Sequence, residues 1–244
     1  MKRNTQPVSK PFAHIDGNVQ IHSIFHTIQG EGPFVGRQAI FIRLEGCNLQ
    51  CPGCDTEYTG GQLYPPETVL QEVDRLTTHY EHDIAYRVCD LIVITGGEPF
   101  RQDIYNLVAT LISAGYIVQI ETNGTLPLTD KMVELKTFFK GENFFIICSP
   151  KGRLHKGIRP YIDAFKYVLH HKDVCPDTSL PTYALTHRLR VEHPPKDFEG
   201  NVYLQPMDCQ DDEINRKNLD AVLRGCKIFN YILCVQVHKI VNVE

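Results

Sequence analysis

The chain has 244 residues, of which 42% are hydrophobic, and its formal net charge is −4. This size and composition favour one domain with a sizeable core, and the lack of a basic run argues against binding to nucleic acid or to an anionic membrane. We therefore expect a small-molecule substrate and neither a nucleic-acid nor a membrane partner.

Strands and helices are expected to alternate along the chain. An apolar run at residues 38–44 predicts a first strand, and residues 67–78 have apolar positions at helical spacing. The same criteria predict further strands at residues 91–95, 117–121, 144–148, 164–169, 201–205 and 232–237, and further helices at residues 104–112, 131–140 and 212–226. This alternation indicates an α/β fold with a parallel sheet, either an open doubly wound sheet or a barrel.

Two segments break this rhythm. Residues 170–200 are rich in proline and mixed charges, and we expect a loop-rich insertion there. Residues 1–22 carry no motif and are expected to be an N-terminal extension of the single domain. Their start has no apolar signal core, and no stretch of the chain approaches the ~18 apolar residues of a membrane helix.

Three of the nine cysteines are clustered in a Cys-x3-Cys-x2-Cys loop after the first predicted strand: Cys47, Cys51 and Cys54. Three thiolates can hold three irons of a four-iron, four-sulfur cluster and leave the fourth iron open for a small molecule. A structural zinc site, which needs four ligands, and unligated thiols are the alternatives. The other cysteines are spread singly, which suits a reducing compartment, and we expect a cytoplasmic protein.

Two further motifs follow predicted strands, where the chemistry of parallel α/β folds gathers. Gly96-Gly-Glu-Pro99 would let the backbone approach a polar ligand closely, although a structural turn is the alternative. Glu121-Thr-Asn-Gly124 offers a carboxylate, a hydroxyl and an amide that suit ribose hydroxyls or an amino acid, although Asn-Gly also favours an ordinary turn.

Together these motifs resemble the radical S-adenosylmethionine enzymes. Within them, the chain is similar to the 7-carboxy-7-deazaguanine synthase family through Ile28-Gln-Gly-Glu-Gly32, Arg43, Cys54-Asp-Thr56, Thr95 to Pro99, Glu121 to Thr125, Ser149-Pro-Lys151 and Gln205-Pro206. The resemblance implies an incomplete TIM-like barrel of mainly parallel strands, usually in a homodimer. The sequence pattern by itself supports only the parallel α/β part.

The resemblance also implies an activity and its cofactors. The family converts 6-carboxy-5,6,7,8-tetrahydropterin into 7-carboxy-7-deazaguanine with loss of ammonia, a ring contraction in queuosine and 7-deazapurine biosynthesis. It uses a four-iron, four-sulfur cluster, S-adenosylmethionine, Mg²⁺ and a reductant such as a flavodoxin. The radical chemistry belongs to the cluster and cofactor, so we expect no further catalytic residue.

The family's functional positions map onto this sequence as three groups. The resemblance assigns the cluster to the three cysteines of the loop and Mg²⁺ to Thr56. It assigns S-adenosylmethionine to Gly53, Asp55, Gly97, Glu98, Glu121, Ser149, Pro150 and Lys151. It assigns the pterin to Ile28, Gln29, Gly30, Glu31, Arg43, Thr95 and Gln205.

The chemistry of several positions agrees with these roles. Mg²⁺ held by one hydroxyl needs substrate oxygens to complete its shell, so ion and substrate are expected to bind together. Arg43, on an apolar strand, needs an anion, either Glu45 or the carboxylate of a ligand. Glu31 could accept the N–H groups of a pterin edge or be a surface carboxylate. The C-terminal residues 238–244 receive no assignment.

Two other kinds of function remain as rivals. One is a glycyl-radical activase, whose substrate is a partner protein. The other is a non-catalytic zinc-binding module, which would contain zinc and neither iron nor sulfide.

Overall fold

The computed structural model describes residues 4–11, 17–139, 141–185 and 189–243. Parts of the predicted N-terminal extension, residue 140 of a predicted helix and residues 186–188 of the predicted loop region lie outside these ranges. Within them, one sheet has the strand order β11-β10-β9-β8-β7-β6-β2-β1-β3. The strands are β1 (Val19–Ile28), β2 (Gln38–Leu44), β3 (Gln62–Tyr64), β6 (Leu91–Gly96), β7 (Ile117–Thr122), β8 (Phe144–Cys148), β9 (Ala164–Leu169), β10 (Asn201–Pro206) and β11 (Ile232–Leu233).

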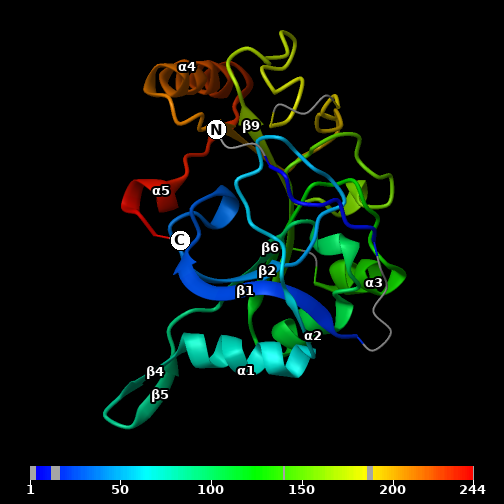
Figure 1. Cartoon of the computed structure of the whole chain (residues 1–244), viewed down its shortest axis with the longest axis vertical. Coiled ribbons are helices and arrows are strands. Elements are labelled where there is room, and N and C mark those ends of the chain that lie inside the picture. Colours follow the sequence, from blue (N-terminus) through cyan, green and yellow to red (C-terminus); the bar gives the residue numbers. More distant parts are fainter. Residues whose placement is uncertain (1–3, 12–16, 140, 186–188, 244) are drawn as a thin grey trace.

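The run from β2 to β11 is parallel throughout, whereas β1 pairs antiparallel with β2 on one side and with β3 on the other. The helices are α1 (Pro66–Thr77), α2 (Tyr105–Ser113), α3 (Asp130–Phe138), α4 (Asp212–Phe229) and α5 (Val237–Val241), with short 3-10 turns η1 (Gly32–Phe34), η2 (Pro99–Arg101) and η3 (Arg159–Tyr161). A hairpin of β4 (Thr78–Glu81) and β5 (Ile84–Arg87) projects from the body beside α1 (Figure 1). The parallel α/β prediction is confirmed.

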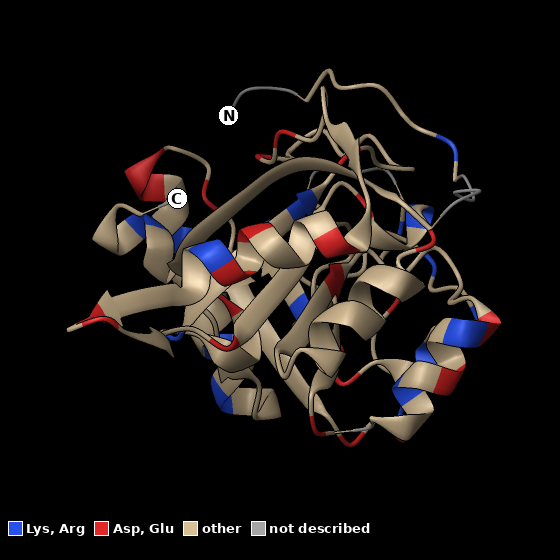
Figure 2. Cartoon of the chain, turned by 90° about the horizontal axis from the view of Figure 1, so that it is seen from below, with Lys and Arg blue, Asp and Glu red and all other residues tan. Residues whose placement is uncertain are grey.

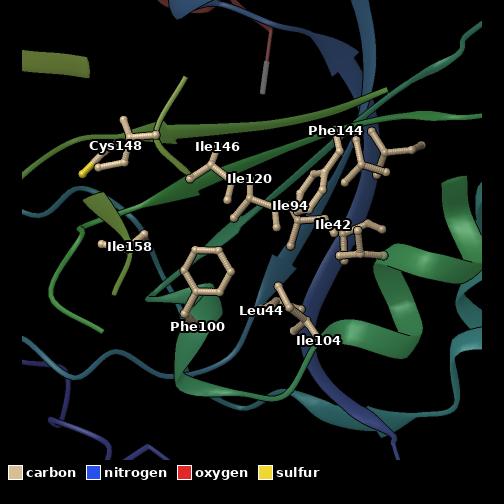
Figure 3. Packing of buried hydrophobic residues seen from close by; sticks show 14 of the residues in the cluster. Ile42, Leu44, Ile94, Phe100, Ile104, Ile120, Phe144, Ile146, Cys148 and Ile158 are labelled. Carbon is tan, nitrogen blue, oxygen red and sulfur yellow. The ribbon is translucent and has the colours of Figure 1, made fainter. Parts of the chain in front are cut away.

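Strict alternation along the strands divides the sheet into two faces. Ile42, Ile94, Ile120 and Ile146 lie on one face and pack into the main core beneath α1, α2 and α3 (Figure 3). These four side chains are fully buried, so they contribute to the hydrophobic driving force that holds the sheet and helices together. The residues between them face the other side, which encloses the interior of the partial barrel.

The floor of that interior is closed by aromatic and aliphatic side chains. Ala39, Leu91 and Val93 form a small buried cluster with Phe34 of η1, and the Phe34 and Phe145 rings meet edge to face with centroids 5.1 Å apart. The chain therefore plugs the amino-terminal end of the strands. The carboxyl-terminal end remains for polar side chains.

Most predicted elements are confirmed, but the last strand is shorter than expected. The predicted strand at residues 232–237 is only Ile232–Leu233 in the structure, because the backbone turns after Cys234 N bonds to Leu204 O and Val237 begins α5. The strand β1 was not predicted, because a bulge between Ile21 and Ser23 interrupts its two-residue period. Residues 170–200 contain only isolated bridges among the described positions, as expected for loops.

Charged residues of both signs are interspersed along the helices seen in Figure 2, in agreement with the absence of a basic run in the sequence. Among the described residues, no helix combines the length and the apolar character that crossing a membrane requires.

Candidate active site

The cysteine loop begins where β2 ends. Gly46, at φ 79°, turns the chain out of the strand, and its N–H bonds to Tyr58 O at 2.8 Å. Cys47 and Cys51 are buried, and burial raises the pKa of the Cys47 thiol to about 12. Burial also raises the pKa of Cys51 and Cys54. Cys47 and Cys51 are therefore shielded from solvent and Cys54 is half-buried, and all three thiols would be deprotonated by metal binding.

The two glycines at the carboxyl end of β6 lie close to the backbone of neighbouring segments. A Cβ on Gly96 would lie 2.2 Å from Leu44 O, and one on Gly97 would lie 2.0 Å from Gly46 O. Gly96 also has φ 133°, which other residues rarely adopt. The sequence argument assigned this pair to close approach of a ligand. The structure shows that a side chain would clash with the backbone of β2 at Gly96 and with that of the cysteine loop at Gly97, and the approach of a ligand stays a prediction.

Glu98 is fully buried and ties two strand ends together. Its Oε1 accepts bonds from Thr122 Oγ1 at 2.7 Å and Phe100 N at 3.1 Å, and its Oε2 accepts one from Asn123 N at 2.7 Å. Burial raises the pKa of this carboxyl group. Glu98 and Pro150 are the two predicted cofactor residues that do not line the cavity described next.

A cavity of about 930 Å³ opens at the carboxyl-terminal ends of the strands and brings the other predicted site residues together. These residues come from the cysteine loop, from the segment after β1 and from the inward-facing positions of the strands. They are Ile28, Gln29, Gly30, Glu31, Arg43, Cys47, Cys51, Gly53, Cys54, Asp55, Thr56, Thr95, Gly97, Glu121, Ser149, Lys151 and Gln205.

Lys166 stands between two carboxylates inside this cavity. Its Nζ pairs with Glu31 Oε2 and lies 3.1 Å from Glu121 Oε2. Burial by itself would raise the pKa of Glu31, but the charge of Lys166 and hydrogen bonds from Lys166 and Gln236 outweigh it and lower that pKa to about 2. Burial would lower the pKa of Lys166, but the charges of Glu121 and Glu31 raise it. Glu31 and Lys166 are therefore both charged at neutral pH.

Amide side chains complete this network. Glu31 Oε1 accepts from Gln205 Nε2 at 3.0 Å and from Gln236 Nε2 at 2.8 Å. Glu121 Oε1 accepts from Gln29 Nε2 at 3.2 Å and from Gln119 Nε2 at 3.0 Å. An ionised carboxylate has about four acceptor positions. The two oxygens that face Lys166 therefore each keep one position for a further donor.

Two more cations lie on the cavity wall. The Arg43 guanidinium lies 5.1 Å from the centroid of the Phe25 ring, a cation–π contact that fixes its plane. Lys151 Nζ donates to Ser149 O at 2.9 Å and to Ser149 Oγ at 2.6 Å, and burial lowers its pKa. Whether Arg43 binds a ligand carboxylate stays a prediction.

Sequence reasoning missed several lining residues, among them Lys166, Gln236 and His238. Lys166 could have been found, since a lysine at an inward position of the apolar strand Ala164–Leu169 needs a partner. Gln236 and His238 gave no such signal. They reach the cavity because the C-terminal segment folds back against Gly30, where Val237 N donates a hydrogen bond to Gly30 O at 3.1 Å. The His238 ring lies so close that a Cβ on Gly30 would be 2.0 Å from its Nδ1.

The donor set fits an iron–sulfur cluster better than a single ion. Within the described ranges, no three Cys, His, Asp or Glu side chains lie close enough together to bind one metal ion. In a cubane each thiolate binds a different iron, so its ligands stay apart, whereas the ligands of zinc surround one ion. The cysteine loop also faces an open cavity, which leaves room for a molecule on the fourth iron.

The parallel partial barrel and this cysteine loop define a radical S-adenosylmethionine enzyme. Residues 41–139 match the family model described as "Radical SAM superfamily". Such an enzyme uses a four-iron, four-sulfur cluster and S-adenosylmethionine, and it acts with a reductant.

The relatives narrow this class to one family, and the chain belongs to the 7-carboxy-7-deazaguanine synthase family. It is 38% identical over 233 residues to the 7-carboxy-7-deazaguanine synthase of Rhodospirillum rubrum, with 91% of this chain and 92% of the relative covered. It is 33% identical over 232 residues to that of Rickettsia prowazekii, with 93% and 89% covered. The activase and zinc-module alternatives are not favoured.

A solved structure shows the same fold. QueE from Escherichia coli superposes with a TM-score of 0.63 at 23% identity, and the match covers 90% of this chain and 94% of that one. This likeness agrees with the partial TIM-like barrel that the sequence resemblance implied.

Proposed function

We propose that this chain converts 6-carboxy-5,6,7,8-tetrahydropterin into 7-carboxy-7-deazaguanine with loss of ammonia, as a step of 7-deazapurine biosynthesis. The observation that carries the proposal is the shared cavity, in which the cysteine loop and the Glu31–Lys166–Glu121 network line one space. One part of this cavity suits the cluster and its cofactor. The other suits a flat, polar ring with several N–H donors.

The network recognises the pterin ring through its remaining acceptor positions. Glu31 and Glu121 each have one oxygen that faces Lys166 and keeps an acceptor site, and the amino and ring N–H groups of the pterin are donors of the matching kind. Arg43 offers a planar fork of donors to the substrate carboxylate. Together these contacts fix the orientation of the ring, which is the main task of the protein in this chemistry.

The cofactor part is made by the cysteine loop and its neighbours. Cys47, Cys51 and Cys54 would hold the cluster, and Gly97 and Lys151 would border the methionine end of S-adenosylmethionine. When bound, these groups supply the 5'-deoxyadenosyl radical that takes a hydrogen atom from carbon 6 of the pterin. Cys47 and Cys51 are buried, and the plugged floor closes the end of the barrel opposite the cysteine loop.

Magnesium is assigned to Thr56 on the rim of the same cavity. A hydroxyl is a weak anchor for this ion, which keeps waters and recruits substrate oxygens. Magnesium and the pterin are therefore expected to bind together. We also propose a cytoplasmic homodimer that receives electrons from a flavodoxin-like protein, on the strength of the family resemblance.

The test is an anaerobic turnover assay with reductant, S-adenosylmethionine, Mg²⁺ and 6-carboxytetrahydropterin, followed by mass analysis. We expect 7-carboxy-7-deazaguanine from the wild type and none from Cys51→Ala. Cys226→Ala, on α4 and away from the cavity, is the matched control and should retain activity. Cleavage of S-adenosylmethionine without this product would refute the substrate assignment and leave the class of enzyme intact.

A further inference from the structure

The described N-terminal residues 4–10 lie against the cysteine loop and form hydrogen bonds with it at Cys47, at Cys51 and at Thr56. Near Cys47, the chain forms a parallel bridge at Val8, and Ser9 N donates to Cys47 O at 2.7 Å. Near Cys51, Asn4 N donates to Pro52 O at 3.0 Å. We call residues 4–10 the N-terminal brace.

Asn4 is the most buried polar residue of the brace, with 9% of its surface exposed. Its Nδ2 donates to Cys51 O at 3.3 Å and to the Tyr58 hydroxyl at 3.2 Å. Its Oδ1 accepts from Gln6 N at 3.0 Å. Asn4 thereby connects the middle cysteine to the segment that follows the loop.

Gln6 holds the other end of the loop with both ends of its amide. Its Nε2 donates to Thr56 O at 2.7 Å, and its Oε1 accepts from Tyr58 N at 2.8 Å. These bonds fix the backbone on both sides of Glu57. They set the position of Thr56, two residues after Cys54.

Hydrogen bonds also connect the brace to the segment that follows β6. Arg101, at the end of η2, donates from Nη1 to Lys10 O at 3.0 Å and from Nη2 to Glu45 O at 2.8 Å. One buried guanidinium therefore joins the brace, the start of the cysteine loop and the Gly-Gly-Glu-Pro segment.

Hydrophobic burial does not explain why the brace lies here. Its one large aliphatic side chain, Val8, is 57% exposed. The brace is instead held by directed hydrogen bonds, many of them to carbonyl groups of the cysteine loop, and Asn4, Thr5 and Gln6 also line the cavity. Outer contacts of this kind orient metal ligands and commonly affect metal affinity about 10-fold or more when removed.

We propose that Asn4 and Gln6 are positioning residues, and that the N-terminal brace holds the cysteine loop in its cluster-binding conformation. The inference needs only the cluster and not the pterin assignment. The brace and the proposed function can therefore fail independently.

The experiment compares reconstituted wild-type protein with the Asn4→Ala/Gln6→Ala double variant under anaerobic conditions. The first readout is the rate at which iron passes to a ferrous chelator, and we expect it to rise about 10-fold. The second is the electron paramagnetic resonance spectrum of the reduced cluster with and without S-adenosylmethionine, whose shape we expect to change. Gln71→Ala, an exposed glutamine on α1, is the matched control.

Thermal unfolding of the metal-free proteins separates positioning from general stability. We expect the double variant to unfold near the wild-type temperature while its cluster is released faster. Wild-type iron release together with a wild-type spectrum would overturn the proposal. If the double variant does not fold, Gln6→Ala is measured in the same way, and the same two results decide.

Discussion

Replacing Glu31 by glutamine should make the free energy of unfolding depend less strongly on pH in the acidic range. The pKa of Glu31 falls from 4.5 to about 2 on folding, mainly through Lys166 and Gln236, which outweigh the effect of burial. A carboxyl group with a lowered folded-state pKa stabilises the protein above its unfolded pKa, and this stabilisation is lost as the pH falls from about 4.5 towards about 2. The full contribution is about 3 kcal/mol.

The assay is urea unfolding of the metal-free protein at about pH 6 and about pH 3. Between these two pH values, protonation of Glu31 lowers the free energy of unfolding of the wild type by about 2 kcal/mol. The Glu31→Gln variant has no carboxyl group at this position and should not show this loss. The variant should start less stable at about pH 6, because Lys166 has lost one buried partner, and it should then decline less.

The exposed Glu134 of α3, changed to glutamine, is the matched control and should follow the wild type. An equal loss of stability for wild type and Glu31→Gln on acidification would refute the account of this network.

Three further substitutions test the packing around the site. Gly97→Ala places a methyl group 2.0 Å from a carbonyl oxygen of the cysteine loop. We expect the free energy of unfolding in urea to fall by about 1–3 kcal/mol and the reconstituted protein to contain less iron. Wild-type values for both measurements would contradict this. Glu98→Gln puts an NH₂ group against buried donors such as Asn123 N, and should cost about 1–3 kcal/mol by the same assay; stability within error of the wild type would show that the bonds are not needed. Gly30→Ala displaces the His238 ring and should raise the KM for the pterin, so an unchanged KM would count against a substrate at that position.

Much of the site could be predicted because parallel strands bring their carboxyl ends to one edge. The motifs after the strands at residues 38–44, 91–95 and 117–121 are far apart in sequence, yet the register of β2, β6 and β7 places them on one cavity. In the structure Thr95 and Glu121 line the cavity, because alternate residues of a strand point to opposite faces of the sheet. The motifs and the order of the parallel strands therefore agree in placing these residues at one edge of the sheet.

The remaining parts depend on contacts that no local pattern encodes. Lys166 is explained only once β9 is known to lie near Glu31 and Glu121. The residues after β11 reach the cavity only because the C-terminal segment folds back against Gly30. The N-terminal brace has no periodic apolar residues that would indicate its position. The packing of Gly96 and Gly97 is not visible in the sequence for the same reason, since the backbone they approach belongs to β2 and to the cysteine loop.

In the proposed reaction the cavity presents carbon 6 of the pterin to the 5' carbon of the adenosyl group. The most direct measurement uses substrate deuterated at carbon 6, turned over anaerobically, with mass analysis of the recovered S-adenosylmethionine. We expect deuterium in 5'-deoxyadenosine or in the recovered S-adenosylmethionine, because the hydrogen atom taken from carbon 6 would pass to the adenosyl group. Product formation with no deuterium in the cofactor or in 5'-deoxyadenosine would contradict this expectation.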